Sequence, residues 1–511
     1  MDDSEKGTVY LIGAGPGDPE LITLKGWRIA KSCDVVLYDS LIPDEIIVSL
    51  PSSIKKIYVG KRGGRQSIPQ DEINEMMVEL ALDGKNIARL KGSDPIIFGR
   101  GGEEAMYLKE HGIRFEIIPG VTSGIAGPTY AGIPCTDRNK ASYIMFLTGH
   151  KAKEKEFSTI PWDWVAKAKG GTLVLYMAVS EIADIVAELI DSGMPPDTPA
   201  ATIERATYPT QRSFKSVLKD LPNIVADQCV KAPALFVIGE VVDLQPYLTW
   251  FEDKPLFGVR VMVTRAAEQA AETYRMLRDL GAEVLPYPTI EISEHFDEEA
   301  WAAFENIRNE NRWLVFTSEN GVRYFMRKLS YHIGDMRHLA YFSIAAVGEG
   351  TARALQKHCI EPDFVPSTAT VADLAAEFSQ YVDAKGATVV RVRGNLSDNT
   401  FEEMAESKGT EVLPLMVYRT SHHRWPMEFK EKLFEYPPDV MLFTSGSTFE
   451  GLFANLNDDE VKRLTSTAKI FSIGPSTSEK IRQRGFEVTA ESTPHTIPAL
   501  IETLVDYMSE V

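Results

Sequence analysis

A glycine-rich turn near the start of the chain is the first feature that could do chemistry. Gly13, Gly15 and Gly17 follow a short apolar run and lead directly into Asp18. Glycines at this spacing let the backbone approach a bound ligand closely. Asp18 stands where a dinucleotide fingerprint would have its third glycine, so the pattern disfavours a nicotinamide oxidoreductase. By itself the turn indicates either a ligand-binding loop or an ordinary tight turn.

Basic residues beside the short motifs of the first half are the second such feature. The chain has a formal net charge of −19, which argues against a nonspecific nucleic-acid binder. A polyanionic substrate would need cations concentrated in one cleft, because the overall field repels it. Alternatively, these residues form a solvated basic face. They are Lys61, Arg62, Arg65, Lys91, Arg100, Arg138 and Arg205.

Composition indicates a globular protein of several lobes. The 511 residues are 44% hydrophobic and 25% charged. The acidic N-terminus does not resemble a signal peptide, and no apolar run is long enough to span a membrane, so we expect a cytoplasmic protein without a membrane partner. Four cysteines show neither disulfide nor zinc spacing, and no metal is expected. They are Cys33, Cys135, Cys229 and Cys359.

The elements that must position these residues follow an α/β pattern over residues 8–242. Short apolar runs alternate there with amphipathic stretches. This pattern predicts two α/β lobes, 8–120 and 121–247. Helices are predicted at 70–85, 101–112 and 181–193, and strands at 8–15, 34–40, 55–61, 86–92, 115–120, 143–150, 171–178, 199–206 and 234–242.

The second half begins after a change of pattern. Residues 248–257 contain Pro, Gly and charges, and are the expected linker. A strand is predicted next at 259–265. Further along, Phe316-Thr317-Ser318 recurs as Phe443-Thr444-Ser445, and Gly348 recurs as Gly474, at nearly the same offset. Constant spacing predicts two copies of one lobe.

Several short phrases occur in order through the first half. They include Tyr38-Asp39-Ser40-Leu41, Val59-Gly60-Lys61-Arg62, Arg89-Leu90-Lys91-Gly92-Ser93-Asp94-Pro95, Ile118-Pro119-Gly120-Val121-Thr122-Ser123 and Tyr176-Met177. In this order they resemble the tetrapyrrole methylase family, and within it the uroporphyrinogen-III C-methyltransferases. The resemblance covers residues 8–250.

This resemblance implies that S-adenosylmethionine, the methyl donor, binds between the two lobes on glycine-rich loops. A sulfonium favours an apolar, carbonyl-rich pocket with few fixed cations. Ser93, Ala178 and Ala206 stand where glycine is usual or occurs in relatives, and such small residues narrow the pocket slightly. The implied donor-binding set is Pro16, Gly92, Ser93, Asp94, Ile97, Thr122, Ser123, Met177 and Ala206.

Asp39 and Lys61 match the family positions with acid–base roles. The acceptor carbon of a pyrrole is electron-rich, so the enzyme must place it in line with the methyl group and provide a base. Asp39 could instead be a turn or cap residue, and Lys61 a carboxylate anchor. The expected cations for the eight substrate carboxylates include Arg62, Arg100 and Arg138.

The second half carries a different set of short phrases. They include Val263-Thr264-Arg265, Gly281-Ala282-Glu283-Val284, Phe316-Thr317-Ser318, Ala346-Val347-Gly348 and Ile473-Gly474-Pro475. Their order over residues 258–511 resembles uroporphyrinogen-III synthases. The resemblance implies two α/β lobes joined by a ribbon near 286–292 and 414–420. Lobe one is then discontinuous, 258–288 plus 418–511, around lobe two at 289–417.

Tyr418 matches the tyrosine proposed as the proton donor in the synthase family. A phenol stays protonated at neutral pH and can assist loss of a hydroxyl group. A packed ribbon aromatic is the alternative. Hydroxyl residues before or within predicted helices could bind carboxylates, or could be helix caps. They are Thr317, Ser318, Thr351, Ser445, Ser447 and Thr477.

The two resemblances together imply a bifunctional enzyme. Its second half closes hydroxymethylbilane to uroporphyrinogen III, and its first half methylates this product at positions 2 and 7 to precorrin-2. The family also implies a homodimer through the first half. Two alternatives stay open: a methylase of a later corrin intermediate, and a second half that only binds tetrapyrroles. The product could serve siroheme, cobalamin or another modified haem.

Overall fold

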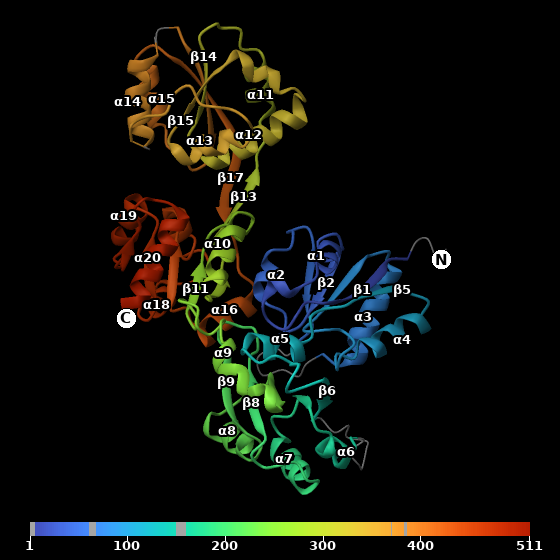
Figure 1. Cartoon of the computed structure of the whole chain (residues 1–511). Coiled ribbons are helices and arrows are strands. Elements are labelled where there is room, and N and C mark those ends of the chain that lie inside the picture. The colour runs from blue at the N-terminus through green and yellow to red at the C-terminus, as the bar shows by residue number, and fades with distance from the viewer. Residues whose placement is uncertain (1–5, 61–67, 150–159, 369, 383–385, 511) are drawn as a thin grey trace. The chain divides into compact units, whose positions relative to one another are not determined.

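The computed structural model describes residues 6–60, 68–149, 160–368, 370–382 and 386–510 (Figure 1). The chain divides into two compact units. The first unit consists of Met1–Pro288 and Trp425–Val511, and the second of Thr289–Arg424. The first unit therefore holds the whole first half together with the beginning and end of the second half.

The first lobe is a parallel sheet covered by helices on both faces. Its strand order is β3-β2-β4-β1-β5. Side chains alternate along β1: Val9 and Leu11 pack in one apolar core, and Ile12 packs in the other. The strands are β1 (Thr8–Gly13), β2 (Val35–Tyr38), β3 (Lys55–Tyr58), β4 (Ile87–Lys91) and β5 (Arg114–Ile118), and the helices are α1 (Leu24–Ala30), α2 (Asp44–Val48), α3 (Gln70–Leu82) and α4 (Gly101–Glu110).

The second lobe has a mixed sheet of order β6-β7-β10-β8-β9. Only β6 and β7 are parallel, and the other neighbours are antiparallel. Strand β9 was not predicted from the sequence, because this edge strand is largely polar and has no fully buried residue. The elements are α5 (Ser123–Tyr130), β6 (Tyr143–Thr148), α6 (Trp162–Lys167), β7 (Gly171–Tyr176), α7 (Ile182–Asp191), β8 (Pro199–Glu204), β9 (Arg212–Val217), α8 (Leu221–Asp227) and β10 (Ala234–Ile238).

The expected linker at 248–257 is packed on both sides. It follows α9 (Gln245–Leu248), and its Phe251 and Leu256 are buried. The indole N–H of Trp250 donates to the Thr129 carbonyl at 3.2 Å. The Leu256 N–H donates to the Leu280 carbonyl at 2.8 Å. This segment is therefore a fixed connection between the two halves.

The next lobe, also in the first unit, is assembled from two separate stretches of chain. Its parallel sheet has the order β12-β11-β18-β19-β20. The chain leaves the sheet after β12 and returns to form β18 beside β11. The elements are β11 (Arg260–Val263), α10 (Ala267–Asp279), β12 (Glu283–Pro286), α16 (Met427–Glu435), β18 (Val440–Phe443), α17 (Gly446–Glu450), α18 (Asp458–Thr465), β19 (Lys469–Ser472), α19 (Pro475–Gln483), β20 (Ala490–Glu491) and α20 (Ile497–Glu510).

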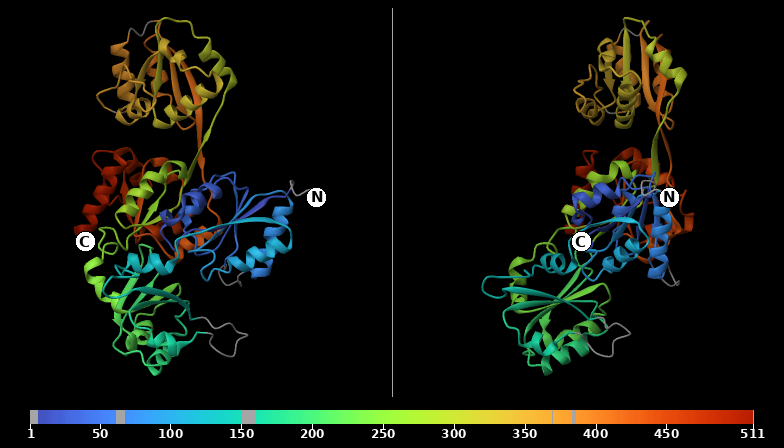
Figure 2. Two further views of the ribbon diagram at one scale, coloured as in Figure 1. Left: turned by 45° about the vertical axis from the view of Figure 1, so that its right-hand side comes forward. Right: turned by 90° about the vertical axis from the view of Figure 1, so that its right-hand side faces the viewer.

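The second unit has a sheet of order β13-β17-β16-β14-β15. Antiparallel pairing of β13 with the end of β17 forms the ribbon, with Ile290 opposite His422 and Glu294 opposite Tyr418 (Figure 2). Its elements are β13 (Ile290–Glu294), α11 (Glu298–Glu305), β14 (Arg312–Phe316), α12 (Glu319–His332), β15 (Ser343–Ala346), α13 (Glu349–Gln356), α14 (Val371–Tyr381), β16 (Thr388–Gly394), α15 (Thr400–Glu406) and β17 (Glu411–His422).

One expected boundary moves. Lobe two was predicted to end at 417, whereas the compact unit extends to Arg424. The reason is that β17 continues to His422 in the sheet of the second unit. Trp425 then begins the return to the first unit, where its indole N–H donates to the Pro288 carbonyl at 2.7 Å.

The internal repeat corresponds to two copies of one strand–cap–helix arrangement. Ser318 follows β14 and caps α12, and Ser445 follows β18 and caps α17. Gly348 precedes α13 after β15, and Gly474 precedes α19 after β19. In each copy the two strands are parallel neighbours.

Among the described residues, no group of three or more His, Cys, Asp or Glu side chains could hold a metal ion. None of the helices in the described part of the chain is long and apolar enough to cross a membrane.

Candidate functional site

The loops after β1, β4 and β5 carry predicted donor-binding residues, and we call them the donor loops. Their backbones are in direct contact. The Ser93 N–H donates to the Gly15 carbonyl at 2.7 Å. A Cβ added to Gly120 would lie 2.4 Å from the Ser93 carbonyl oxygen and 2.7 Å from the Cα of Gly13. Only glycine fits at Gly120, because any Cβ there would clash with the backbones of Ser93 and Gly13. The same contacts fix the positions of the residues next to Gly120.

Hydroxyl groups join these loops. The Ser123 N–H donates to Ser93 Oγ at 2.7 Å, and Ser93 Oγ lies 3.3 Å from Thr122 Oγ1. Asp94 accepts the N–H groups of Ile97 and Gly120, both at 3.1 Å. The structure thus brings together five of the predicted donor-binding residues: Ser93, Asp94, Ile97, Thr122 and Ser123.

Tyr176 connects this network to the second lobe. It ends β7, and its buried phenol oxygen lies 2.7 Å from Thr122 Oγ1. The same oxygen accepts the Gly124 N–H at 2.6 Å. Tyr176 belongs to the phrase Tyr176-Met177 but was not among the predicted site residues. Its position at the carboxyl end of a buried strand, beside Met177, was the available signal.

The other predicted donor residues lie around the same loops. Met177 is half exposed, and both Met177 and Ser93 have positive φ angles, 53° and 68°. Ile97 packs against the core that contains Ala206. A Cβ added to Gly92 would lie 2.7 Å from Leu41 Cβ, so this glycine touches the loop after β2. Pro16 is half buried in the first turn.

Asp39 makes both a turn and an ion pair. Its Oδ1 accepts the Leu41 N–H at 3.0 Å, and its Oδ2 lies 3.2 Å from the guanidinium of Arg89. Asp39 is therefore a turn residue, as the alternative expected. Its carboxylate is nevertheless partly exposed beside the donor loops. Lys61, Arg62 and Arg65 lie outside the described residues.

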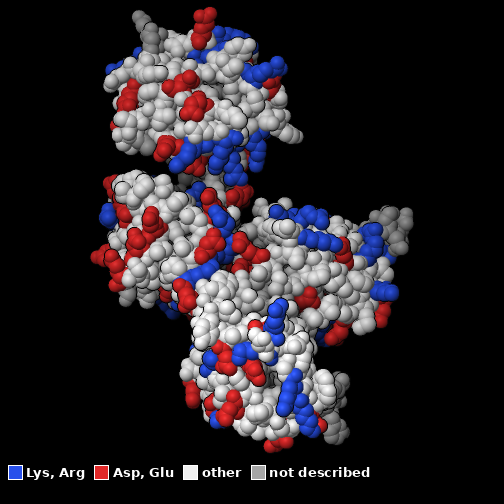
Figure 3. Space-filling view, viewed as in Figure 1, with Lys and Arg blue, Asp and Glu red and all other residues white. Residues whose placement is uncertain are grey.

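Of the expected cleft residues that the structure describes, Lys91, Arg100 and Arg205 are already paired with protein carboxylates. Lys91 is buried with its ammonium 2.8 Å from the fully buried Glu104, and burial lowers its pKa. Arg100 pairs with Glu103 at 2.7 Å. The expectation that Lys91 offers its charge to a substrate is wrong, because Glu104 neutralises it inside the lobe. Arg138 is exposed, and on the face shown in Figure 3 acidic and basic side chains are interspersed over the first half.

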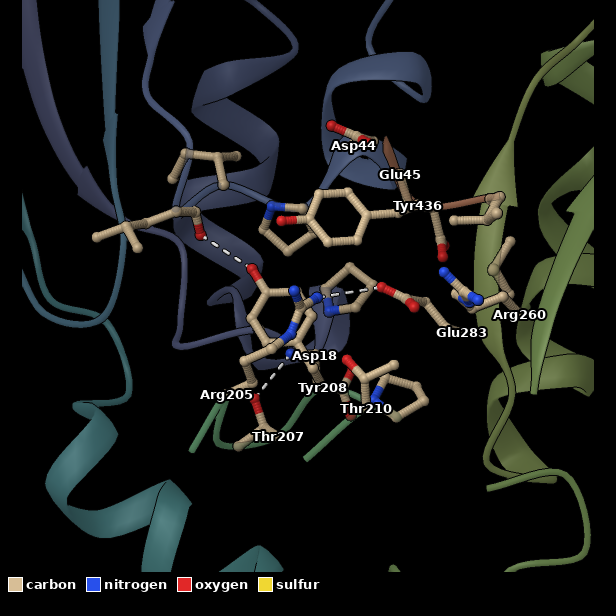
Figure 4. A pocket seen from close by; sticks show the side chains of 18 of the residues that line it. Asp18, Asp44, Glu45, Arg205, Thr207, Tyr208, Thr210, Arg260, Glu283 and Tyr436 are labelled. Carbon is tan, nitrogen blue, oxygen red and sulfur yellow. Dashed lines mark hydrogen bonds and ion pairs between the residues drawn. The ribbon is translucent and has the colours of Figure 1, made fainter. Parts of the chain in front are cut away.

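A cavity of about 1150 Å³ lies beside these loops (Figure 4). Asp39, Leu41 and Arg205 line it from the first half. Arg278 and Glu283 line it from the second half, within the first unit. The walls of the cavity include both polar and aromatic side chains. Gly17 and Asp18 of the first donor loop also line it.

Tyr418 lies beside Ser318 in the second unit. The two hydroxyl oxygens are 3.2 Å apart. The Tyr418 ring stacks on Tyr324 with centroids 5.9 Å apart, and a Cβ at Gly394 would come within 2.5 Å of this ring. Burial raises the pKa of Tyr418, while Ser318 and Arg391 act in the opposite direction. Its phenol therefore stays protonated at neutral pH.

The other hydroxyls of the second half have local partners or are buried. Ser318 Oγ accepts the Gly321 N–H at 3.0 Å, and Ser445 Oγ accepts the Thr448 N–H at 3.3 Å, so the cap alternative holds for both serines. The remaining contacts are between Ser445 and Ser447 (2.9 Å) and between Thr317 and the Val392 carbonyl (3.5 Å), while Thr351 and Thr477 are buried within α13 and α19.

Comparison with known proteins now assigns both halves. The model of the tetrapyrrole (corrin/porphyrin) methylases matches residues 8–222, and that of uroporphyrinogen-III synthase HemD matches residues 271–502. The porphyrin biosynthesis protein HemD of Ruminiclostridium josui is 36% identical over 505 residues, which cover 98% of each chain. This chain belongs to the same family. It is a tetrapyrrole methylase domain fused to a uroporphyrinogen-III synthase domain, both of them α/β.

Other relatives cover the methylase domain alone. The S-adenosyl-L-methionine-dependent uroporphyrinogen III methyltransferase of Methanosarcina barkeri is 48% identical over 242 residues, 47% of this chain and 94% of the relative. A crystal structure of the uroporphyrin III C-methyl transferase from Thermus thermophilus is 36% identical, covering 47% of this chain and 94% of that chain with a TM-score of 0.40.

Proposed function

We propose that this protein catalyses two consecutive steps of tetrapyrrole biosynthesis. The synthase domain closes hydroxymethylbilane to uroporphyrinogen III with release of water. The methylase domain then transfers two methyl groups, to positions 2 and 7, and forms precorrin-2. The observation that carries the proposal is the succession of both domains, which a single relative shares over 98% of both chains.

The donor loops fit S-adenosylmethionine. They present backbone groups, small side chains and the hydroxyls of Ser93, Thr122 and Ser123. The nearby charge of Lys91 is neutralised by Glu104, so it does not oppose a sulfonium. When bound, S-adenosylmethionine supplies the methyl group. The loops would orient it toward a pyrrole carbon in the adjacent cavity, which is the main requirement of this reaction.

Asp39 is our candidate for the proton transfer that accompanies methylation. Its carboxylate lines the cavity and is held by Arg89 and by the Leu41 N–H. A base fixed in this way can accept a proton from the macrocycle without first reorienting. Lys61 remains a proposed partner in this step on the family resemblance, and Arg62, Arg100 and Arg138 remain proposed contacts for the substrate carboxylates.

In the synthase domain, Tyr418 is our candidate proton donor. Its phenol would protonate the terminal hydroxyl of the bilane, which then leaves as water while the ring closes with inversion of the last pyrrole. Ser318 orients this phenol through its hydroxyl. Thr317, Ser318, Thr351, Ser445, Ser447 and Thr477 remain the proposed carboxylate contacts, with helix capping already a second role for Ser318 and Ser445.

A coupled assay from hydroxymethylbilane with methyl-labelled donor tests the proposal. We expect precorrin-2 carrying two labels. The isomer formed without donor is equally informative, because spontaneous closure gives uroporphyrinogen I and the enzyme gives III. Isomer I alone, with methylation of supplied uroporphyrinogen III intact, would instead support a synthase domain that only binds tetrapyrroles. Failure to methylate supplied uroporphyrinogen III would contradict the methylase assignment.

We also propose that the enzyme works in the cytoplasm as a homodimer through the methylase domain. The four cysteines are all free, which agrees with a reducing compartment. Sedimentation of the full chain tests the dimer.

A further inference from the structure

The cavity in Figure 4 has walls from both domains. From the methylase domain come Asp39, Arg205 and Thr210, and from the synthase domain come Arg278 and Glu283. The second wall belongs to the fused synthase domain. The residues of this wall are therefore candidates for a role that the fusion adds.

Three residues that line the cavity each have a polar side-chain atom without a hydrogen-bond partner among the described residues. These atoms are Arg205 Nε, Thr210 Oγ1 and Arg278 Nε, and all three are buried. A buried donor without a partner is costly, so several at one cavity indicate that a ligand supplies acceptors there. Two guanidinium groups and a hydroxyl match carboxylate oxygens in chemistry.

Both arginines already hold carboxylates of the other domain. Arg205 lies 3.3 Å from Glu283 of the synthase domain, with its guanidinium over the Tyr208 ring at 4.9 Å. Arg278 pairs with Glu20 at 3.0 Å and with Glu45, both of the methylase domain. An arriving carboxylate would therefore replace a similar group, and such an exchange changes the Coulomb energy little.

The cavity also has the right position and size for the methyl acceptor. Leu41, which lines it, touches Gly92 of a donor loop, and Tyr208 touches Gly17 of another. A volume of about 1150 Å³ can take most of a tetrapyrrole. A bound macrocycle would thus have its carbon atoms near the donor loops and its carboxylates near the second wall.

We propose that the synthase domain completes the methyl-acceptor site, where Arg205, Thr210 and Arg278 bind carboxylates of uroporphyrinogen III and Glu283 competes with them for Arg205. This inference rests on the proposed methyltransferase activity. It adds that affinity for the acceptor depends on residues of the other domain.

Two substitutions in the full-length chain test it with opposite signs. Glu283→Gln removes the competing charge at constant shape, and we expect the KM for supplied uroporphyrinogen III to fall about three- to tenfold. Thr210→Val removes one donor and should raise this KM about three- to tenfold. The KM for the methyl donor should not change in either variant.

Thr202→Val is the matched control. Thr202 also has a buried hydroxyl without a partner in the described structure, but it lies in β8 and does not line the cavity. We expect wild-type kinetics from it. Unchanged acceptor KM in both Glu283→Gln and Thr210→Val would overturn the inference while leaving the methyltransferase activity in place. A wild type that does not methylate uroporphyrinogen III would overturn the proposed function itself, and the inference with it.

Discussion

In the methylase domain, side chains around the donor loops contact one another through their hydroxyl groups. In the synthase domain, most candidate hydroxyls instead cap, or lie within, the helix next to them. Ser93, Thr122 and Tyr176 form one chain of contacts across two sheets. Ser318 and Ser445 each cap the helix that follows them. A substitution should therefore spread through the first region and stay local in the second.

Tyr418 is the exception in the synthase domain, and it should give the largest effect. It contacts Ser318 and Tyr324, which come from α12 and its cap, rather than a group of its own strand. For Tyr418→Phe we expect formation of uroporphyrinogen III from hydroxymethylbilane to fall about a hundredfold, the usual scale for loss of a general acid. Methylation of supplied uroporphyrinogen III should be unchanged.

The control for this variant is Tyr381→Phe, because Tyr381 lies in the same unit and is exposed. If Tyr418→Phe closes the bilane to isomer III at the wild-type rate, its ring is a packing residue. In that case all the candidate hydroxyls of the synthase domain would have local structural roles only.

The next effect concerns Glu45, which lies where the two domains meet in the first unit. Burial raises its pKa to about 7, with Arg278 acting in the opposite direction. The unfolded chain ionises this group at a lower pH, so the stabilisation is present at acid pH and is lost as the pH rises toward 7. Relative to Glu45→Gln, wild type should lose about 2 kcal/mol between pH 5 and pH 8.

Unfolding of both proteins by denaturant across this pH range measures the difference. Glu72→Gln is a suitable control, because Glu72 is exposed on α3. A constant difference between wild type and Glu45→Gln would show that this carboxylate does not titrate with folding.

Tyr176→Phe should break the connection between β7 and the loop that precedes α5 in the methylase domain. It leaves the Gly124 N–H without its acceptor. We expect about a tenfold weaker binding of S-adenosylhomocysteine and a similar rise in the donor KM, while kcat changes less. Isothermal titration and initial rates give both values.

Tyr143→Phe provides the comparison, since the buried Tyr143 hydroxyl has no partner in the described structure. This variant should bind the donor product as wild type does. Wild-type donor binding in Tyr176→Phe as well would mean that Tyr176 contributes packing alone, because phenylalanine keeps the ring.

The smallest effects on stability are expected for the two capping serines. Ser318→Ala and Ser445→Ala should each cost about 1 kcal/mol of local stability. Hydrogen exchange should quicken in α12 for the first variant and in α17 for the second. Faster exchange near the donor loops in either variant would contradict a local role.

Much of this architecture follows from the sequence, because the parallel strands are short apolar runs with helices between them. The repeat of Phe-Thr-Ser and the glycine turns also have direct structural counterparts. Other features lack a local pattern. The strand β9 is a polar edge, and the pair Arg205–Glu283 joins residues 78 positions apart. The role of Tyr176 depends on Thr122 and Gly124, which are more than 50 positions away in the sequence.

The discontinuous lobe has a consequence for the order of folding. β11 and β12 leave the ribosome long before β18, which must insert beside β11 to complete the sheet. Until then β11 exposes an unpaired edge. The chain leaves the first unit after Pro288 and returns to it at Trp425, 137 residues later. Folding of Thr289–Arg424 brings these two points together, so that Pro288 and Trp425 can form their hydrogen bond. Once folded, the inserted unit shortens the loop that must close before β18 can pair with β11. Destabilising the inserted unit should therefore slow the folding of the lobe that contains β11 and β18, although the unit is not part of that lobe.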